Sequence, residues 1–308
     1  MPRETHAGAR VALVTEDRLE RLTPGHWYTD NVLADDALVM RGLAARGVAS
    51  ERVSWSRADV EWGSYDAAVL RTTWDYFDRF AEFRAWLGRV SAATRLLNPP
   101  ALVGWNADKH YLRDLEARGV ATVPTIFVER GSRATLAALL AEHGLAEAVL
   151  KPAVSGAARH TYRVTPATAG AHEAILAELL RAEAMLLQPF QRAIVDEGEI
   201  TVVVIDGQVT HALRKIARAG DFRVQDDHGG RVVPHTPSAD EVAFAARAFA
   251  ACEPAPLYGR VDMVRGEGGR LQVMELELVE PELWFRMAPA AAERFAAGIA
   301  ARLGPASG

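Results

Sequence analysis

One stretch of ten residues, Leu-Gln-Val-Met-Glu-Leu-Glu-Leu-Val-Glu at positions 271–280, limits the fold of this chain more than any other. Its alternating pattern is typical of a β-strand, in which successive side chains point to opposite faces of a sheet. Glu275 and Glu277 would then share one face, about 6 to 7 Å apart along the strand. The opposite face is mainly apolar, so we expect it to pack on a core while the two carboxylates point away from that core.

A second predicted strand, residues 258–264, precedes this one across the glycine-rich turn at 266–269. Antiparallel pairing places Asp262 opposite or diagonal to Glu275. Three carboxylates would converge there, and Arg260 could offset only part of their charge. Like charges this close are unfavourable unless a cation lies among them, and Mg²⁺ suits one or two carboxylates together with phosphate oxygens. The alternative is a polar strand surface that faces solvent.

Lysine is rare in this chain. Only three of the 35 Lys and Arg residues are lysines, namely Lys109, Lys151 and Lys215. An ammonium group is a compact point charge, whereas the guanidinium of arginine is a planar fork, so the sites that keep lysine are candidates for binding phosphate. Chance survival of three lysines is the simpler explanation.

The sequence around each lysine favours the phosphate interpretation. Lys109 is predicted in the first turn of a helix that Asn106 caps and Gly119 ends, where a bound phosphate would suit both the lysine and the helix dipole. Lys151 ends an apolar strand, and the small residues 153–158 that follow would let backbone N–H groups approach phosphate oxygens. Each feature alone also fits an ordinary exposed lysine or a hairpin loop.

Lys215 follows a predicted hairpin that turns at Asp206 and Gly207. With Arg214 and Arg223 it could form a clamp for a polyphosphate. The alternative, of about equal weight, is a basic loop in water.

The order of predicted elements indicates two kinds of architecture. Strands and helices alternate over the first 100 residues or so, which favours an open α/β sheet, and 98–100 (Asn-Pro-Pro) is a predicted boundary. The remainder is predicted as two α+β units. Expected strands lie at 10–15, 48–55, 67–72, 123–128, 148–151, 160–164, 184–188, 200–205, 208–213, 258–264 and 271–279. Expected helices lie at 31–46, 80–90, 107–118, 135–143, from 167, 239–251 and 289–303.

Composition excludes several classes of function. The net charge of -5 argues against nucleic acid as a partner. No apolar stretch approaches the roughly 18 residues of a membrane helix, and the short apolar run at 11–14 does not resemble a signal peptide. A single cysteine, Cys252, fits a reducing compartment, so we expect a cytoplasmic protein. The oligomeric state stays open, with a homodimer as one expectation.

A set of motifs recurs in an order that resembles the ATP-grasp superfamily, on the branch of glutathione synthetase and the ribosomal-protein glutamate ligases. The resemblance covers roughly residue 106 to the C-terminus. Its motifs are Lys151-Pro152 with the small-residue loop, Gln188-Pro189-Phe190, the segment 220–223 leading to Gly229-Gly230, Asp262, and Glu275-Leu276-Glu277.

A narrower resemblance points to the O-ureido-serine cyclo-ligases of D-cycloserine biosynthesis and their relatives. It rests on four segments: Arg71-Thr72-Thr73-Trp74-Asp75-Tyr76, 105–109 (Trp-Asn-Ala-Asp-Lys), 222–225 (Phe-Arg-Val-Gln) and 275–281 (Glu-Leu-Glu-Leu-Val-Glu-Pro).

The resemblance implies an ATP-grasp fold with three domains: an N-terminal open α/β domain (1–105), a small central α+β lid domain (106–188) and a C-terminal α+β domain (189–308). It also implies a nucleotide site, in which lysines contact the phosphates, the small-residue loop covers them and residues 185–190 hold adenine. The residues carried over to this site are Lys109, Lys151, Ser155, Gly156, Ala157, Gln188, Pro189, Phe190 and Glu197.

The same resemblance implies that Asp262, Glu275 and Glu277 hold two Mg²⁺ ions, which Mn²⁺ could replace, and that Arg223, Lys215 and Arg260 neutralise the transferred phosphate. Glu277 stands where glutathione synthetase has Asn, which adds charge to the metal site. The loop after Lys151 also has fewer glycines than many members of the family.

The organic substrate is expected beyond the carboxyl ends of the N-terminal strands. Arg71 follows such a strand, and its guanidinium suits a substrate carboxylate. The residues predicted for this pocket are Arg71, Thr72, Trp74, Asp75, Tyr76 and Glu280. The alternative is a strand-to-helix turn with aromatic packing, in which Asp75 holds Arg71 in a structural pair.

Three functions remain open at this point. The first is a Mg-ATP-dependent ligase that activates a carboxylate or ureido-type acyl group of an amino-acid-like substrate for attack by an amine. The second is a cyclo-ligase that closes a ring within one O-ureido-serine-like molecule. The third is a catalytically silent ATP-binding module, against which the full set of lysines and carboxylates counts.

Overall fold

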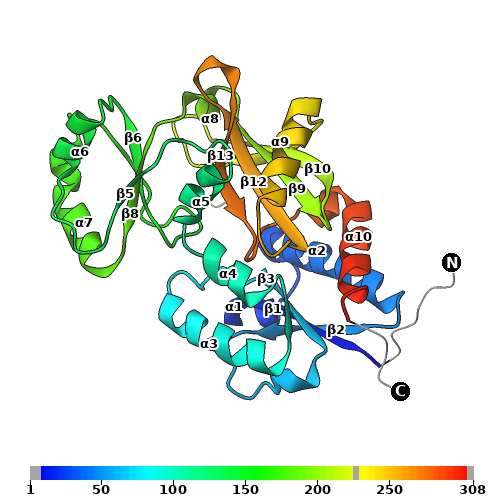
Figure 1. The fold of residues 1–308 in the computed structure, drawn as a ribbon. Helices are drawn as coiled ribbons and strands as arrows, with labels where there is room; N and C mark the ends of the chain where they lie inside the picture. The colour runs from blue at the N-terminus through cyan, green and yellow to red at the C-terminus, as the bar shows by residue number, and fades with distance from the viewer. Residues whose placement is uncertain (1–7, 225–228, 304–308) are drawn as a thin grey trace.

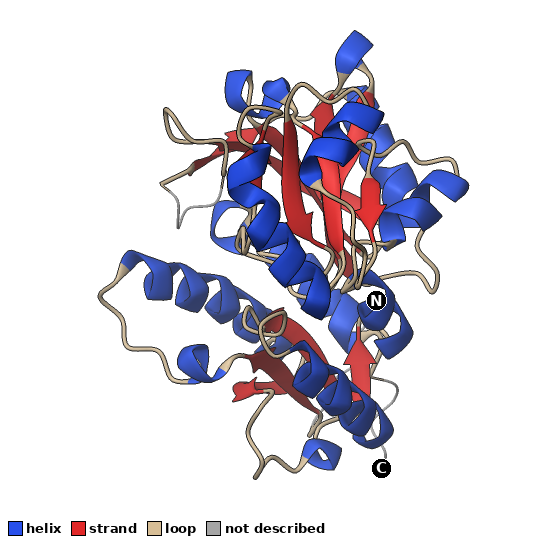
Figure 2. Ribbon diagram, turned by 90° about the vertical axis from the view of Figure 1, so that its left-hand side faces the viewer, coloured by secondary structure: helices blue, strands red, loops and turns tan. Residues whose placement is uncertain are grey.

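A computed structural model describes residues 8–224 and 229–303, which form three β-sheets with their helices. Figure 1 shows the N-terminal unit in blue and cyan, the central unit in green, and the C-terminal sheet in yellow-green to orange. Figure 2 shows helices flanking the strands in both the upper and the lower part of the molecule.

The N-terminal sheet is parallel, as the alternating pattern predicts. Its strands are β1 (Arg10–Thr15), β2 (Ala49–Ser54), β3 (Ala67–Thr72) and β4 (Arg95–Leu97), in the order β2-β1-β3-β4. Every residue of β3 is buried, which is typical of a parallel strand covered on both faces. The helices are α1 (Asp17–Glu20), α2 (Trp27–Ala44) and α3 (Phe80–Ala93), with a 3-10 turn at Trp62–Ser64.

The central sheet is antiparallel and carries its two long helices together. Its strands are β5 (Ile126–Val128), β6 (Ala148–Pro152), β7 (Tyr162–Val164) and β8 (Met185–Pro189), in the order β5-β8-β6-β7. Helices α6 (Leu136–Glu142) and α7 (Ala169–Ala182) share a hydrophobic core with the strands, in which Leu136, Leu150 and Leu176 are fully buried. The opposite face of β6, with Val149 and Lys151, is left for the cavity described below.

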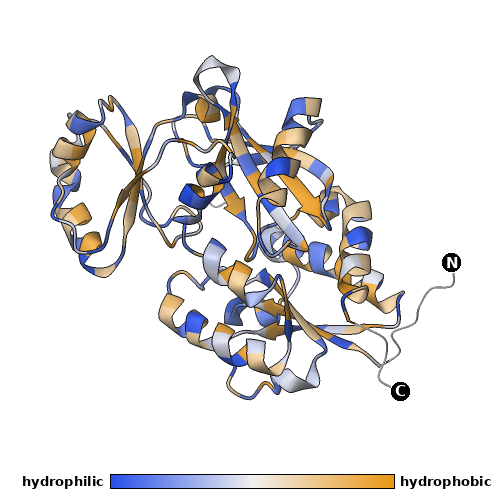
Figure 3. Ribbon diagram, in the orientation of Figure 1, coloured by the Kyte–Doolittle hydropathy of each residue, from blue (hydrophilic) through white to orange (hydrophobic). Residues whose placement is uncertain are grey.

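The C-terminal sheet is antiparallel in the order β11-β10-β9-β12-β13. Its strands are β9 (Glu199–Ile205), β10 (Gln208–Ile216), β11 (Arg231–His235), β12 (Tyr258–Arg265) and β13 (Leu271–Glu277). Its helices and turns are α8 (Arg192–Asp196), α9 (Ala239–Ala250), a 3-10 turn at Glu267–Gly269 and another at Phe285–Met287. In Figure 3 hydrophobic residues follow the strands of this sheet, while hydrophilic residues lie on the outer turns of the helices.

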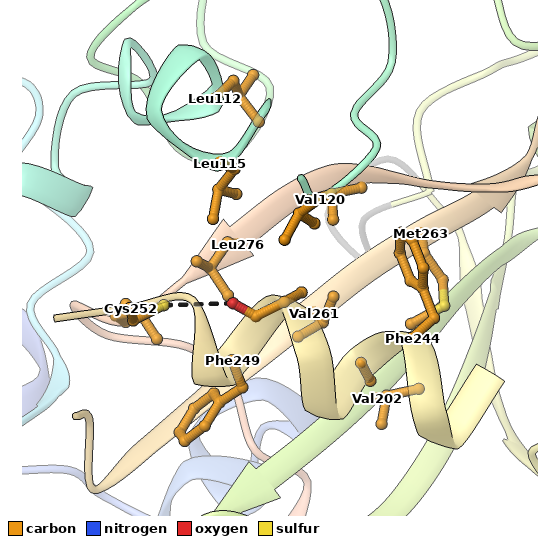
Figure 4. Close-up of a cluster of buried hydrophobic side chains, with 14 of the residues drawn as sticks. Leu112, Leu115, Val120, Val202, Phe244, Phe249, Cys252, Val261, Met263 and Leu276 are labelled. Carbon is orange, nitrogen blue, oxygen red and sulfur yellow. Dashed lines mark hydrogen bonds between the residues drawn. The ribbon is translucent and has the colours of Figure 1, made fainter. Parts of the chain in front are cut away.

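Two helices that precede the central sheet pack near this C-terminal sheet. They are α4 (Pro100–Asn106) and α5 (Tyr111–Ala117). Figure 4 shows Leu112 and Leu115 of α5 above Leu276, with Phe249 and Cys252 among the labelled side chains below. The last helix, α10 (Pro289–Ala300), packs on α2 so closely that a Cβ on Gly42 would lie 2.7 Å from Ala296 Cβ. The domain boundaries at 105/106 and 188/189 stay a prediction.

The predicted helix over 107–118 is wrong in its first part. The structure has a helix that ends at Asn106 and another that begins at Tyr111, and Lys109 lies between them rather than in a first helical turn. Asn106 caps no helix, because its side chain donates to Leu276 O at 2.8 Å and accepts from Leu278 N at 2.7 Å. Gly119 does end the second helix, with φ 80°.

Several short elements were not predicted: α1, α4, β4, α8 and β11. Other boundaries moved by a few residues, and α2 begins at Trp27 instead of 31. None of the helices in the described residues is both long enough and apolar enough to span a lipid bilayer.

Candidate active site

A cavity of about 300 Å³ lies where the three sheets meet. The central sheet contributes residues of β6 and β8, the C-terminal sheet contributes β9, β10, β12 and β13, and the N-terminal unit contributes the start of α2 and the segment after β3. The predicted site residues that line it are Trp74, Tyr76, Lys109, Lys151, Ser155, Gly156, Ala157, Gln188, Pro189, Phe190, Lys215, Arg223, Arg260, Asp262, Glu275, Glu277 and Glu280. Those that do not are Arg71, Thr72, Asp75 and Glu197.

The predicted pairing of the two carboxylate strands is confirmed. Asp262 on β12 lies opposite Glu275 on β13, and Arg260 lies opposite Glu277. The register shifts directly after Asp262, at a β-bulge. Asp262 is 1 % exposed and also accepts a hydrogen bond from Thr201 Oγ1 of β9 at 2.9 Å. The alternation of β13 therefore brings its glutamates to the cavity, as the sequence indicates.

The carboxylates are neutralised more fully than the sequence predicts, because the cations come from other elements. Lys215 Nζ of β10 lies 2.8 Å from Asp262 Oδ2, and Arg260 donates to both oxygens of the same carboxylate. Lys109 Nζ lies 3.0 Å from Glu275 Oε1, and Arg260 also pairs with Glu277.

These pairs shift the titration of the buried groups. Burial lowers the pKa of Lys215, but Asp262 and Glu199 outweigh that effect and leave the pKa raised. Burial raises the pKa of Asp262, but Arg260 and Lys215 outweigh it and hold the pKa well below the usual range. For Glu277 burial dominates over Arg260, and the pKa rises to about 7. The cluster is therefore a network of compensated charges.

Lys109 is held in place by two acceptors. Besides the carboxylate of Glu275, its Nζ donates to Ser155 O at 2.6 Å, and its backbone N–H donates to Ala153 O at 2.9 Å. The break between α4 and α5 thus joins the loop after β6 to β13.

Lys151 has no ion pair in the part of the chain that the structure describes. It lies on β6 opposite Leu186 of β8, and its side chain lines the cavity. Burial lowers its pKa, Glu275 opposes this shift and Lys109 adds to it. A half-buried ammonium without an ion-pair partner among the described residues favours an anionic ligand.

The loop after β6 has an unusual backbone. Ala157, Ala158 and His160 have positive φ values of 48°, 56° and 47°, which is uncommon for residues other than glycine. A Cβ on Gly156 would lie 2.5 Å from Phe77 Cε1, so only glycine fits against this ring of the N-terminal unit. Arg159 adds an ion pair with Asp78 at 3.2 Å.

The segment Gln188–Phe190 lines the side of the cavity next to the central sheet. Gln188 Nε2 donates to Thr125 Oγ1 at 2.9 Å, and the ring of Phe190 meets Phe222 edge to face at 6.0 Å. Arg223, also at the cavity, pairs with Asp221 at 2.7 Å. Gln225, the last residue of the motif at 222–225, lies outside the described residues.

The sequence analysis assigned Glu197 to the nucleotide site, but the acidic residue of this segment that lines the cavity is Glu199. Glu197 is exposed, and its carbonyl accepts from Arg214. Glu199 is the first residue of β9, is 7 % exposed and pairs with Lys215, and burial raises its pKa. Glu199 and Thr201 are two positions apart on one strand and so share a face, and Thr201 contacts Asp262. This alternation could have identified Glu199 from the sequence.

The predicted substrate residues of the N-terminal unit separate into two groups. Trp74 and Tyr76 line the cavity. Arg71 is 3 % exposed and pairs with Asp36 of α2, at 3.1 Å between Nε and Oδ1. The proposed pair between Arg71 and Asp75 is wrong, because Asp75 accepts instead from Trp55 Nε1 and Arg79 Nη1.

The sequence analysis missed several other lining residues: Trp27, Tyr28, Asn31 and Trp284. Trp27 is half exposed at the start of α2, a position that the predicted helix start at 31 left in a loop. The aromatic cluster at 27–28 was the available signal.

The acidic residues fit a Mg²⁺ ion that arrives with phosphate. Asp262, Glu275 and Glu277 offer the oxygen ligands that Mg²⁺ prefers. Among residues 8–224 and 229–303, no three His, Cys, Asp or Glu side chains form a ready group that could hold a metal ion, so the predicted convergence of three carboxylates is not present as such. Lys215 and Arg260 pair with Asp262, Arg260 also pairs with Glu277, and Lys109 pairs with Glu275, so cations occupy the positions that a metal ion would neutralise.

Two family models match this chain. The model described as the N-terminal domain of D-cycloserine synthetase DcsG matches residues 11–98, and the RimK-like ATP-grasp domain matches residues 166–281. The chain is 35% identical over 279 residues to the cycloserine biosynthesis protein DcsG of Streptomyces lavendulae, with 84% of this chain and 90% of that protein covered.

Solved structures agree with these matches. The crystal structure of D-cycloserine synthetase DcsG superposes with a TM-score of 0.85 at 33% identity, covering 96% of this chain and 100% of that one. D-alanine–D-alanine ligase from Bacillus anthracis complexed with ATP superposes with a TM-score of 0.66 at 16% identity, covering 96% and 97%, which shows a shared fold.

Proposed function

This chain belongs to the ATP-grasp ligases of the DcsG family, and from that premise we propose that it phosphorylates an acyl oxygen of a small amino-acid derivative and closes a ring within that molecule. Its ATP-grasp fold and ATP-dependent ligase class follow from the family, and ATP-grasp ligases use ATP and Mg²⁺. The observation that carries the proposal is the cavity in which Lys151 has no ion pair with any described residue and in which residues of the N-terminal unit face the carboxylate strand.

The nucleotide occupies the side of the cavity next to the central sheet in this proposal. Lys109 and Lys151 bind its phosphates, and the backbone of 155–157 covers them. Gln188, Pro189 and Phe190 hold the base, while Glu199 replaces Glu197 as the acidic residue at the nucleotide. Support comes from the free charge of Lys151 and from the lining of the cavity.

Asp262, Glu275 and Glu277 would hold Mg²⁺ together with the phosphates. The ion supplies neutralisation of phosphate charge. Two ions, and exchange with Mn²⁺, are part of the proposal. Lys109 and Arg260, which pair with Glu275 and Glu277 in this structure, would exchange these partners for phosphate oxygens when Mg²⁺ takes over the carboxylates.

The first chemical step forms a bond between an oxygen of the substrate's carboxylate, or of a ureido-type acyl group, and the γ-phosphorus, while the bond to the ADP oxygen breaks. Lys215, Arg223 and Arg260 stabilise the charge on the transferred group. A nitrogen then attacks the acyl carbon and loses a proton, and phosphate leaves. The loop at 155–160 excludes water, which would otherwise hydrolyse the intermediate.

Ring closure is favoured over ligation of two molecules by the similarity to D-cycloserine synthetase, which extends over the N-terminal unit as well as the ATP-grasp region. Joining a second, separate amine to the activated acyl group is the alternative. Both reactions pass through an acyl phosphate, and they differ only in whether the attacking nitrogen belongs to the same molecule or to a second one.

The test uses O-ureido-serine of either configuration with an ¹⁸O-labelled carboxylate, Mg²⁺ and ATP. We expect ADP and singly ¹⁸O-labelled phosphate without any added amine, and a product formed from one substrate molecule. Glu275→Gln should abolish turnover and keep the fold, whereas Glu293→Gln, at an exposed site on α10, should not. A strict requirement for a second amine would favour intermolecular ligation. Unlabelled phosphate would contradict phosphorylation of the carboxylate and leave the ureido-type acyl group as the site of phosphorylation.

A further inference from the structure

Nearly every charged side chain that lines the cavity is paired with an opposite charge. Arg223 pairs with Asp221, Glu199 with Lys215, and Glu282 with Arg286. The carboxylates of Asp262, Glu275 and Glu277 are paired as described above. Two lining residues have no ion pair in residues 8–224 and 229–303: Lys151 and Glu280. Lys151 is assigned to phosphate, so Glu280 is the charge that the proposed chemistry does not use.

Glu280 is held firmly by its backbone. It follows β13, and its carbonyl oxygen accepts a hydrogen bond from Trp74 Nε1 at 3.0 Å. Tyr76, which is 5 % exposed, lies near the Glu280 charge. Glu280 therefore faces the cavity beside the segment after β3, at the end that the N-terminal unit closes.

Aromatic rings surround this end of the cavity. Trp74 meets Tyr28 edge to face at 5.8 Å, and Tyr28 meets Trp27 at 5.6 Å. All three line the cavity. Aromatic faces attract ammonium groups, so a carboxylate among such rings is a recognised environment for an organic cation.

We propose that Glu280 binds the ammonium group of the amino-acid substrate, with Trp74 and Tyr28 forming the aromatic wall around it. The proposal rests on the proposed function and deepens it by assigning a residue to the free, charged α-amino group of the substrate. Glu280 would thus hold this group, which does not react, and direct the neighbouring acyl group toward Lys151 and the phosphate side of the cavity.

The physical argument is one of charge compensation. Burial raises the pKa of Glu280 well above its ordinary value, with the negative charge of Glu277 acting in the same direction. The positive charge of Lys109 opposes this shift, but Lys109 already binds Glu275 and the Ser155 carbonyl. A carboxylate in such a place is unfavourable until a cation binds to it. A ligand ammonium supplies that cation, and a neutral ligand does not.

The test compares two compounds that differ only at the amino group: O-ureido-serine and its deamino analogue, 3-(ureidooxy)propanoate. Binding is measured by calorimetry with ADP and Mg²⁺ present, and turnover by phosphate release. We expect the wild-type protein to prefer the amino compound by about 10- to 100-fold. In Glu280→Gln this preference should disappear, because affinity falls for the amino compound and stays nearly unchanged for the analogue.

Two further variants sharpen the test. Trp74→Leu removes the ring and should weaken binding of the amino compound alone, by about fivefold. Glu293→Gln, an exposed glutamate on α10, is the matched control and should keep the full preference.

Equal binding of the two compounds by the wild-type protein, or binding of neither, would overturn the ammonium site. An equal loss for both compounds in Glu280→Gln, together with a higher Mg²⁺ requirement, would place Glu280 at the metal instead. Selective binding of the amino compound without any ATP-dependent turnover would support the ammonium site and contradict the proposed ligase reaction, so the two proposals can fail separately.

Discussion

Two groups of charged side chains in this protein both combine cations with carboxylates, but only one of them lines a cavity. The cavity charges are Lys109, Lys151, Lys215, Arg260, Asp262, Glu275 and Glu277, which line a cavity of about 300 Å³. The N-terminal ionic cluster is Asp36, Arg52 and Arg71, with side chains that are 3 to 9 % exposed. Both groups combine arginines with carboxylates, yet only the first has room for a ligand.

The surroundings of Arg71 explain the difference. Its guanidinium lies 5.2 Å from the ring centre of Phe285 and 5.8 Å from that of Phe295, and Nη1 has no hydrogen-bond partner among the described residues. The void beside it has a volume of about 10 Å³, enough for about one water molecule. A charged residue at the end of a strand is therefore a binding residue only where the packing leaves space in front of it.

The largest effect is expected at the free cation of the cavity. Lys151→Ala should lower the affinity for Mg-ATP by about 100-fold, because no other lining cation is without an ion pair in the described residues. The measurement is a calorimetric titration. Arg57→Ala, which removes a partly exposed arginine paired with Glu20 and Asp59, is the control. Equal affinities in the two variants would show that the cavity charges are as inert toward the nucleotide as the N-terminal cluster.

The second effect concerns stability and not catalysis. Arg71→Lys should lower the free energy of unfolding by about 3 kcal/mol, since a lysine cannot reproduce the fork between Asp36 and the two phenylalanine rings. The kinetic constants of the folded fraction should stay nearly unchanged. Chemical denaturation and steady-state assays measure the two quantities.

The control for Arg71→Lys is Arg84→Lys, at an exposed position of α3, which should change neither the free energy of unfolding nor the kinetic constants. A fall in kcat/KM for the organic substrate at unchanged stability would instead restore Arg71 as the predicted substrate anchor.

The comparison also shows what the sequence can reveal. The face that carries Glu275 and Glu277 was predictable because strand alternation is a local rule, and the partner Asp262 lies just across a short turn. The structural role of Arg71 was not predictable, because it depends on Asp36 in another element and on aromatic rings more than 200 residues away. Long-range packing leaves no local pattern.

Asn106 is a similar case. An Asn before a polar segment is a good helix cap, and the sequence was interpreted in that way. The actual partners of its side chain are backbone groups of β13 and the residue after it, 170 and 172 positions later. Likewise Pro100 begins α4, although the Asn-Pro-Pro segment was interpreted only as a boundary.

The third prediction uses two buried asparagines. Asn106 binds the backbone on both sides of Glu277, while Asn98 binds it on one side only, at Leu278 O, and otherwise binds Leu257 and Tyr258. Either change to alanine leaves backbone groups unpaired and should lower the free energy of unfolding by about 2 kcal/mol. Only Asn106→Ala should also raise the Mg²⁺ concentration needed for half-maximal turnover. The same Mg²⁺ requirement in both variants would mean that Asn106 acts on stability alone.

The smallest effect is expected at Glu16, a buried carboxyl of the N-terminal unit that is 1 % exposed. Its Oε1 pairs with Arg18 at 2.7 Å, and Oε2 has no hydrogen-bond partner among the described residues. Burial raises the pKa of Glu16 to about 7, although Arg18 opposes the shift. Between the ordinary carboxyl pKa near 4.5 and this value, the folded protein binds more protons than the unfolded chain, so its stability falls as pH rises.

Glu16→Gln stays neutral and escapes this loss. Relative to wild type, the variant should therefore gain stability as pH rises from about 5 to about 8, by an amount on the order of 1 kcal/mol. Denaturant titrations across this range measure the difference, with the exposed Glu293→Gln as control. A constant difference between Glu16→Gln and wild type at every pH would mean that Glu16 is ionised throughout. The N-terminal unit would then hold a buried negative charge as readily as the cavity does. The difference between the two regions in how they accommodate buried charges would be limited to the surroundings of Arg71.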